Sequence, residues 1–394
     1  MKSELYYGFD KPLDRNKTES IKWELPRKSE NEHAIPMWVA DMDFRTASCV
    51  IDALKSRTEH GAFGYSSGEE TDKAALINWL KRRHNCNIEQ NNILFSPGVV
   101  DSIYHILRAL LKKGDSVIIQ PPVYGPFKAM IEKAGMKAVK NPLKINNNRY
   151  EPDFEGLEAA LKKGAKALLI CSPHNPVGRI WSKSELETTA YLCKKYNVLL
   201  LCDEIHADIE LDGNRHTSII TVKAAENAIM LVSATKTFNL AALRHSAIIC
   251  RDDQILAKIN ERLNEVMADI NLYGRLATRA AYLNGDKWLD ALNEYISDGK
   301  KIFMNRINNI PGLSSTNTEG TYLNWLDAKE LGMDDEKLYS FFVNECGIIP
   351  SRGTDFGTEG SGFLRINLAT THANIIKAAE NIERAVSKLE NNRL

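Results

Sequence analysis

Short apolar runs alternate with amphipathic stretches between about residues 90 and 250, and this alternation constrains the fold more than any other feature. Most runs are rich in Val, Ile and Leu without polar residues at alternate positions, which is typical of strands buried on both faces. The runs are Asn92–Phe95, Ser116–Gln120, Ala167–Cys171, Val198–Cys202, Ile229–Val232 and Ala247–Cys250. The intervening stretches, such as Ser184–Tyr196, have helical spacing. The pattern therefore predicts an α/β fold around a mostly parallel sheet.

The sequence beyond residue 285 predicts further helices outside the alternating region. Asp286–Asn309 has the spacing of one long helix, and Pro311 and Gly312 follow it as stop signals. Near the end of the chain, apolar residues recur at spacings of four and three, which predicts an amphipathic helix. These residues are Ile375, Ala379, Ile382, Val386 and Leu389. We therefore expect a large α/β domain followed by a smaller α+β domain.

Polar or aromatic residues follow five of the apolar runs directly. The segments are Ser96–Gly98, Pro121–Tyr124, Ser172–Pro176, Asp203–His206 and Ser233–Lys236. In parallel α/β sheets, ligands bind beyond the carboxyl ends of the strands, where such segments meet. Each segment alone is compatible with ordinary loop chemistry. Together they predict one ligand site at this edge of the sheet.

Lys236 is the first candidate for covalent chemistry. It follows a buried run, so loss of hydration can lower the pKa of its amine and make it a Schiff-base nucleophile. An isolated lysine is more often a solvated surface residue. Here Ser233 and Arg244 lie close in the sequence, and a hydroxyl and a guanidinium are suitable donors to a phosphate dianion. The combination favours a phosphorylated ligand bound near Lys236.

Asp203 and His206 follow the run Val198–Cys202. A carboxylate at this edge of the sheet can keep a ring nitrogen protonated, or it can bind a metal ion together with His206 and Asp208. No second His or Cys lies at ligand spacing, so we expect no metal. His206 is either a neighbour of the cofactor or a hydrogen-bonded loop histidine.

Two further segments offer groups to a flat, phosphorylated ligand. Gly98 and Val99 begin a helix expected to reach about Leu111, and the free N–H groups of a helix start bind anions. Asn175 can hydrogen-bond a ring hydroxyl and Tyr124 can stack on a ring, although turn and core roles are equally compatible with these residues. The chain has neither G-x-G-x-x-G nor G-x-x-x-x-G-K-[ST], so a dinucleotide fold or a P-loop lacks its motif.

Arg365 lies inside the apolar run Phe363–Leu368, which has the character of a strand. A buried guanidinium requires an anionic partner, and a substrate carboxylate matches the two-pronged geometry of the group. A structural ion pair with an Asp or Glu is the alternative interpretation. The sequence alone leaves both interpretations of Arg365 open.

Composition restricts the partners of the chain. The 51 Lys and Arg residues balance 51 Asp and Glu, which argues against a nucleic-acid-binding protein. Seven cysteines without C-x-x-C pairs or zinc spacing indicate reduced thiols. The N-terminal sequence lacks the apolar core of a signal peptide, and no apolar run has membrane-spanning length. We therefore expect a cytoplasmic protein with no nucleic-acid, membrane or metal partner.

Several of these motifs resemble one enzyme family. In order and spacing, four motifs resemble those of fold-type I pyridoxal-phosphate enzymes of the class I/II aminotransferase group. They are Asn175-Pro-Val-Gly, Asp203-Glu-Ile-His, Ser233-x-x-Lys236 with Arg244, and Phe363-Leu-Arg365-Ile-Asn. The resemblance covers nearly the whole chain. Longer motifs are similar to the MalY/PatB-type cystathionine β-lyases. These motifs are Ile35-Pro-Met-Trp-Val-Ala-Asp-Met-Asp-Phe44, Gly64-Tyr65, Pro122-Val-Tyr-Gly-Pro-Phe127 and Ser172-Pro-His-Asn-Pro-Val-Gly-Arg-Ile-Trp181.

The resemblance implies a bound pyridoxal 5′-phosphate cofactor. Lys236 would bond covalently to it, Asp203 would pair with its ring nitrogen, and Asn175 would contact its ring hydroxyl. Tyr124 would stack on the ring beside His206, which occupies a position where many transaminases have a tyrosine. The implied phosphate ligands are Gly98, Val99, Ser233, Arg244 and, from a second subunit, Tyr65.

The resemblance also implies the substrate contacts and the reaction. Arg365 would bind the α-carboxylate, with Trp38 and Ala40 as further substrate contacts, and Tyr65 would assist catalysis in a homodimer. The implied reaction is β-elimination of cystathionine or a related cysteine thioether to a thiol, pyruvate and ammonia. An aminotransferase acting on an amino acid is the alternative, since such relatives share most of the motifs. A regulatory protein that retained the fold is a third possibility.

The resemblance implies domain boundaries as well. A large cofactor-binding domain would span residues 47–285, and a smaller domain made of residues 1–46 and 286–394 would close over the substrate. The sequence departs from the family pattern at a few positions, which bear on substrate identity rather than on cofactor binding. These positions are Ala242, where glycine is usual; Asp355, in a loop expected near the substrate; and Thr371-His372, where Pro and Arg are expected.

Overall fold

The computed structural model describes residues 7–28, 31–146 and 148–391, and its centre is a seven-stranded sheet. The strand order is β2-β10-β9-β8-β7-β3-β4. The strands are β2 (Ile93–Ser96), β3 (Ser116–Ile119), β4 (Lys137–Lys140), β7 (Ala167–Cys171), β8 (Leu199–Asp203), β9 (Ile229–Val232) and β10 (Ser246–Ile249). All neighbours pair in parallel except β10, which is antiparallel to both β2 and β9. The prediction of a mostly parallel sheet is confirmed.

Alternate residues of the central strands enter two different cores. On β7, Ala167 and Leu169 pack into the core formed with α5 (Val99–Leu110), whereas Leu168 and Ile170 pack into the core on the opposite face. Because both faces are covered, these strands carry no polar alternation, which is why the runs were recognisable in the sequence. β7 and β9 begin and end where their runs do, β3 ends one residue earlier than predicted, and β2, β8 and β10 are displaced by one residue.

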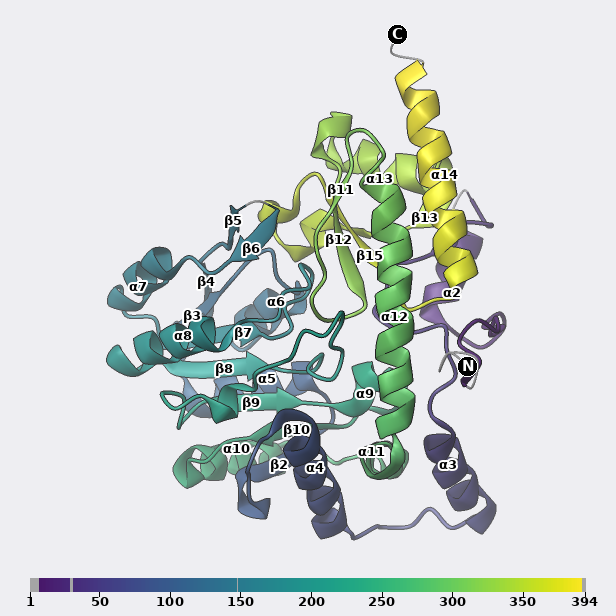
Figure 1. The fold of residues 1–394 in the computed structure, drawn as a ribbon. Coiled ribbons are helices and arrows are strands. Elements are labelled where there is room, and N and C mark those ends of the chain that lie inside the picture. Colours follow the sequence, from purple (N-terminus) through teal and green to yellow (C-terminus); the bar gives the residue numbers. More distant parts are fainter. Residues whose placement is uncertain (1–6, 29–30, 147, 392–394) are drawn as a thin grey trace.

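Helices cover both faces of the large sheet (Figure 1). One face is covered by α5, α6 (Pro126–Lys133) and α10 (Asp253–Glu265). The other face packs against α4 (Glu69–His84), α7 (Phe154–Lys162), α8 (Lys183–Lys195) and α11 (Leu272–Asn284). α8 was predicted at Ser184–Tyr196; it starts at a capping box between Ser182 and Glu185. α3 (Ser48–His60) packs on α11, and a small hairpin pairs β5 (Lys144–Asn146) with β6 (Arg149–Glu151).

A second, four-stranded antiparallel sheet follows the long helix α12 (Asp286–Ile307) in the chain, and α12 runs past both sheets (Figure 1). Its strands, in order, are β11 (Ser314–Ser315), β12 (Leu323–Asp327), β15 (Phe363–Asn367) and β14 (Ser351–Arg352). α13 (Asp335–Asn344) and α14 (His372–Asn391) help to form its core. The two predicted helices are present, and the buried stripe on α14 includes Ile375 and Ile382.

The N-terminal segment joins this second sheet region rather than the large sheet. It contains α2 (Ile21–Lys28) and β1 (Ile35–Pro36), and β1 pairs in parallel with β13 (Ile348–Ile349). The predicted smaller domain includes residues 1–6 and 392–394, which lie outside the described part of the chain. Over the part of the chain that the structure describes, none of the helices combines the length and apolar character needed to cross a membrane.

Candidate active site

A cavity of about 430 Å³ lies at the carboxyl ends of the large sheet, and all five predicted segments contribute to its wall. The contributing residues include Pro97 and Gly98, Tyr124, Asn175, Asp203 and His206, and Thr235 and Lys236. The N-terminal segment adds Val39 and Ala40, and β15 of the second sheet adds Arg365. The cavity thus lies where the two sheets and the N-terminal segment meet, and it combines an amine, a carboxylate and a guanidinium.

Lys236 lies on the short helix α9 (Ala234–Thr237), directly after β9. Ser233 caps this helix, because its Oγ accepts a hydrogen bond from the Thr235 N–H. The Lys236 Nζ donates to the Ala40 carbonyl at 2.7 Å. Burial, with the nearby Arg365 charge, lowers the pKa of Lys236 to about 8. An amine with this pKa is partly neutral near physiological pH and can therefore act as a nucleophile or a base.

Asp203 ends β8, and one of its oxygens accepts a hydrogen bond from the Ile205 N–H at 3.0 Å. Burial raises the pKa of the Asp203 carboxyl to about 7. No cationic side chain among the described residues forms an ion pair with Asp203, so a cationic ligand group would satisfy it. Burial, together with Lys236 and Arg365, lowers the pKa of His206 to about 3, so this imidazole is neutral. No described group of His, Cys, Asp or Glu is arranged to hold a metal ion.

Arg365 is 5% exposed and reaches the cavity from β15. Its Nη1 donates to Asn175 Oδ1 at 3.1 Å, and its Nη2 donates to the Trp38 carbonyl at 2.7 Å and to Ser351 Oγ at 3.1 Å. Its Nε is buried without a partner, and burial lowers the pKa of Arg365 to about 10. No carboxylate of the described residues forms an ion pair with it. Of the two interpretations of Arg365, the structural ion pair is therefore not observed.

The part of the cavity at the N-terminus of α5 is suited to an anion. Gly98, Val99 and Val100 line it at the N-terminus of α5, where backbone N–H groups are free of helical partners. Arg244 also lines it and pairs with Asp101 at 2.7 Å. Both of these side chains are largely exposed, so the pair is weak and an incoming phosphate can compete with Asp101 for the guanidinium.

Three predicted site residues do not line the cavity of this chain. Tyr65 is fully exposed on the segment between α3 and α4. The Ser233 hydroxyl donates to the His245 carbonyl at 2.6 Å and lies behind the cavity wall. The Trp38 indole donates to the Lys22 carbonyl, and only the backbone of Trp38 serves the site, by accepting from Arg365. Ala40 likewise contributes its carbonyl, to Lys236.

Several lining or supporting residues were not predicted. Thr235 lies within a predicted segment, and Asp101 lies in the first turn of a predicted helix, so both had a local signal. Val39 lies between two predicted residues. Ser351 and Tyr322 had no signal, because they reach Arg365 and the Ala40 carbonyl only through the folding of the second sheet region.

The departures from the family pattern lie outside the cavity wall. Ala242 belongs to a short turn of 3₁₀ helix before Arg244. His372 begins α14, and its ring stacks on that of Tyr295 with the ring centroids 3.8 Å apart, which is a structural contact. The Asp355 carbonyl packs against Gly125, where an added Cβ would lie 2.4 Å from that oxygen. Asp355 therefore lies beside the segment that carries Tyr124.

Comparison with known proteins places this geometry in a family. The family model "Aminotransferase class I and II" matches residues 33–382. Cystathionine beta-lyase PatB of Bacillus subtilis is 36% identical, over 96% of this chain and 100% of the relative. Among solved structures, cystalysin of Treponema denticola, which contains pyridoxal 5′-phosphate, has a TM-score of 0.93 and 32% identity over 97% of this chain and 99% of that one.

A further solved structure, the PLP-bound C–S lyase of Staphylococcus hominis, has a TM-score of 0.90 and 30% identity. The similarity covers 96% of this chain and 98% of the S. hominis chain. Sequence and backbone similarity thus extend over both sheets and over the segments that form the cavity. The chain therefore belongs to the family of class I and II aminotransferases and has the type I fold of pyridoxal-phosphate enzymes.

Proposed function

We propose that this chain is a pyridoxal-phosphate-dependent C–S β-lyase that converts cystathionine or a related cysteine thioether to a thiol, pyruvate and ammonia. One observation carries the proposal. Lys236, Asp203 and Arg365 line one cavity, and their hydrogen bonds to described residues go to uncharged groups rather than to oppositely charged side chains. A cofactor and an α-carboxylate would supply these missing partners. The names of the similar lyases support this choice of reaction.

The cavity residues fit the cofactor. A protonated ring nitrogen would provide the cation that the buried Asp203 lacks. Asn175 uses its Oδ1 for Arg365, which leaves its NH₂ group to donate to the ring hydroxyl. The N–H groups at Gly98 and Val99, with Arg244, would hold the phosphate. Ser233 would have to turn from the His245 carbonyl to join them, and Thr235, which lines the cavity, offers a second hydroxyl.

The residues of the chain would then divide the work of the elimination. When bound, the cofactor supplies an electron sink for the carbanion at the substrate Cα. Arg365 fixes the α-carboxylate. Lys236, as the neutral amine, would take the proton from Cα. The Cβ–S bond would then break, the sulfur would leave with the electron pair of that bond, and the Cα electron pair would form a Cα=Cβ double bond. Water would hydrolyse the released unsaturated amine to pyruvate and ammonia. Because a thiol has a pKa of about 8.5, the thiolate leaves without a strong acid. Lys236 or Tyr65 of a second copy can return a proton to it.

The decisive experiment supplies the enzyme, loaded with cofactor, with cystathionine in the absence of any keto acid. We expect continuous release of pyruvate and thiol in equal amounts, because elimination regenerates the cofactor without a second substrate. Pyruvate is measured with a coupled dehydrogenase and thiol with a chromogenic disulfide. Turnover that requires an added keto acid would instead identify an aminotransferase, in which the proton returns to the cofactor carbon.

We also propose that the chain works as a homodimer in which Tyr65 serves the neighbouring site. Tyr65 lies outside its own cavity, and exposed apolar side chains gather in the same region: Phe63 is 56% exposed and Met267 is 81% exposed. Phe63 contacts Tyr273, which brings the two exposed segments together. Covering such a patch is a common reason for dimerisation.

Subunit mixing tests the dimer. Tyr65→Ala and Lys236→Ala are each expected to be inactive alone, and co-refolding them should restore about a quarter of the wild-type activity, since random pairing gives hybrids with one intact site. Lyase activity is measured after mixing, alongside sedimentation. A fully active monomer, or mixtures that stay inactive while sedimentation shows hybrids, would contradict the shared site.

The domain boundaries remain a proposal: residues 47–285 bind the cofactor, and residues 1–46 with 286–394 close over the substrate. Support comes from the separate core around α14 and from the pairing of β1 with β13. We further propose a reducing cytoplasmic location, which is supported by seven cysteines that are all free of disulfides. An amino acid as small-molecule substrate agrees with the family.

A further inference from the structure

The segment of residues 38–43, which we call the strap, lies across the two cations of the site. The Trp38 carbonyl accepts a hydrogen bond from Arg365 Nη2, and the Ala40 carbonyl accepts one from Lys236 Nζ, each at 2.7 Å. Arg365 and Lys236 form no ion pairs with described residues. The hydrogen bonds to these two carbonyls are the shortest that the two cations make within the described chain. The position of the strap therefore bears directly on the orientation of both cations.

Two asparagines bind the strap, one on β15 with Arg365 and the other two residues after α9, which carries Lys236. Asn367, which follows Arg365 on β15, donates to the Val39 carbonyl at 2.6 Å and to the Asp41 carbonyl at 2.7 Å. Asn239, which follows Lys236, accepts from the Met42 N–H and donates to the Met42 carbonyl, each at 2.9 Å. The strap is thus attached to each cation-bearing element at more than one point.

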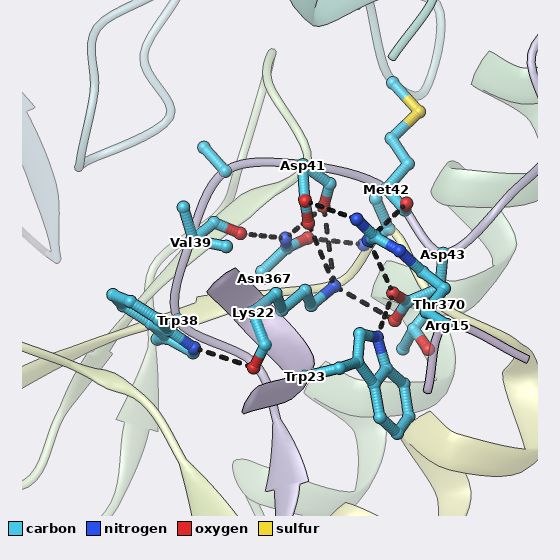
Figure 2. A network of polar contacts seen from close by, with 12 residues as sticks. Arg15, Lys22, Trp23, Trp38, Val39, Asp41, Met42, Asp43, Asn367 and Thr370 are labelled. Carbon is cyan, nitrogen blue, oxygen red and sulfur yellow. Dashed lines mark hydrogen bonds and ion pairs between the residues drawn. The ribbon is translucent and has the colours of Figure 1, made fainter. Parts of the chain in front are cut away.

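The strap has no regular secondary structure, and one backbone hydrogen bond, from the Asp43 N–H to the Ala369 carbonyl at 2.9 Å, supplements its side-chain contacts. In addition to the two asparagines, a cluster of Arg15, Lys22, Asp41 and Asp43, which we call the lock, holds the strap (Figure 2). Lys22 is fully buried, and its Nζ lies 2.9 Å from Asp43 Oδ2 and 3.7 Å from Asp41 Oδ1. Arg15 lies 2.8 Å from Asp41 Oδ2 and 3.3 Å from Asp43 Oδ1. Two cations therefore balance two strap carboxylates.

Further donors complete the lock. The Trp23 indole donates to Asp43 Oδ1 at 2.9 Å, and Arg15 also donates to the Met42 carbonyl at 3.0 Å (Figure 2). A fully buried lysine is costly unless it is paired, so Lys22 strongly favours the one strap position that brings both carboxylates within reach.

We propose that Lys22 and Arg15 are positioning residues for Lys236 and Arg365, and that they act through the strap carboxylates Asp41 and Asp43 and the carbonyls of Trp38 and Ala40. No lock side chain forms a hydrogen bond or an ion pair with Lys236 or Arg365, although the Asp41 charge offsets part of the lowering of the Lys236 pKa. The inference rests on the proposed function only in taking Arg365 as the carboxylate ligand and Lys236 as the cofactor lysine. It does not depend on whether the reaction is elimination or transamination.

The test compares Lys22→Met with Lys300→Met as a matched control. Lys300 is also buried, at 3% exposure, and pairs with Asp212, but it lies on α12 and makes no contact with the strap. Both variants remove a buried lysine that is paired with a carboxylate, although the partner of Lys300, Asp212, is exposed and also pairs with Lys301. A second, milder comparison pairs Arg15→Gln with Arg83→Gln: the side chains are 17% and 16% exposed, and Arg83 pairs with Asp290 on α12 rather than with the strap.

The readouts are thermal unfolding, bound cofactor and the dissociation constant for L-alanine, measured from the change it causes in the visible spectrum of the loaded enzyme. Alanine carries the α-carboxylate but no leaving group at Cβ, so it cannot undergo elimination, and the spectral change is read immediately after mixing, before any transfer of the amino group. KM and kcat are measured separately on the substrate. If wild-type enzyme showed no visible cofactor band, the proposed function would fail before the lock was tested.

We expect Lys22→Met to weaken alanine binding by about tenfold or more, because misplacing a binding group by about 1 Å can cost ~100-fold. KM should rise more than kcat falls. Lys300→Met should lose stability while it keeps the wild-type affinity. Equal effects in Lys22→Met and Lys300→Met, or wild-type affinity in Lys22→Met, would overturn the proposal. If Lys22→Met does not fold, the comparison of Arg15→Gln with Arg83→Gln decides in the same way.

Discussion

Replacing Lys236 by alanine is expected to lower lyase turnover by about four orders of magnitude or more and to remove the visible absorbance band of lysine-bound cofactor. The variant loses the amine that would bond to the cofactor and, with it, the base that would take the Cα proton. The cavity should otherwise persist, because Asp203, Asn175 and Arg365 are held by other contacts. Activity is measured as pyruvate release, and the band by absorbance after removal of free cofactor.

A small exogenous amine provides the control for Lys236→Ala. Methylamine should restore part of the turnover, because it can take the vacated position and accept the proton, whereas it should not affect the wild-type enzyme. Retention of the visible band in the variant would show that another lysine bonds to the cofactor. Full turnover without added amine would show that a different residue takes the proton.

Replacing Arg365 by glutamine is the prediction with the next largest effect. We expect kcat/KM to fall by roughly a hundredfold, or about 3 kcal/mol, because truncating one partner of a buried charge pair costs about 2–5 kcal/mol. Most of the loss should appear in KM, since the carboxylate is bound in both the ground state and the transition state. The measurement is a set of initial rates of pyruvate release over a range of cystathionine concentrations.

Arg352→Gln serves as the neighbouring control for Arg365→Gln. Arg352 lies on β14, beside β15, and pairs with the exposed Glu336 rather than with the cavity. Its replacement should leave KM unchanged. Arg365→Lys adds a further comparison, because it keeps the charge but not the two-pronged geometry. A wild-type KM in Arg365→Gln would place the carboxylate site elsewhere in the cavity.

The sequence predicted the large sheet well because of how that sheet is buried. β7 and β9 are covered on both faces, so burial alone determined their composition and their limits. The reversed direction of β10 was not predictable, since a buried run has the same composition in either direction. β4 was also missed: its sequence, Lys137–Lys140, carries lysines at both ends and forms an edge of the sheet.

The position of the site could be predicted from the sheet, but the residues that hold the site in place could not. Strand ends in a mostly parallel sheet converge, so the segments around Asp203 and Lys236 could be assigned to one cavity before any contact was known. The lock could not be found in this way. Lys22 is separated from Asp43 by 21 residues, and a lone lysine in a polar stretch has the sequence character of a surface residue. Only the tertiary structure shows that Lys22 is buried.

Because Arg365 has no carboxylate partner among the described residues, it affects which ligands the enzyme binds. A ligand that carries a carboxylate completes the hydrogen bonding of this guanidinium, whereas an amine, ester or amide of the same shape would exclude water and leave a buried cation without a counter-ion. Discrimination of this kind needs no steric clash, because the cost arises from the group that the wrong ligand fails to satisfy. Decarboxylated and esterified analogues would thus be rejected by the charge that the protein already holds.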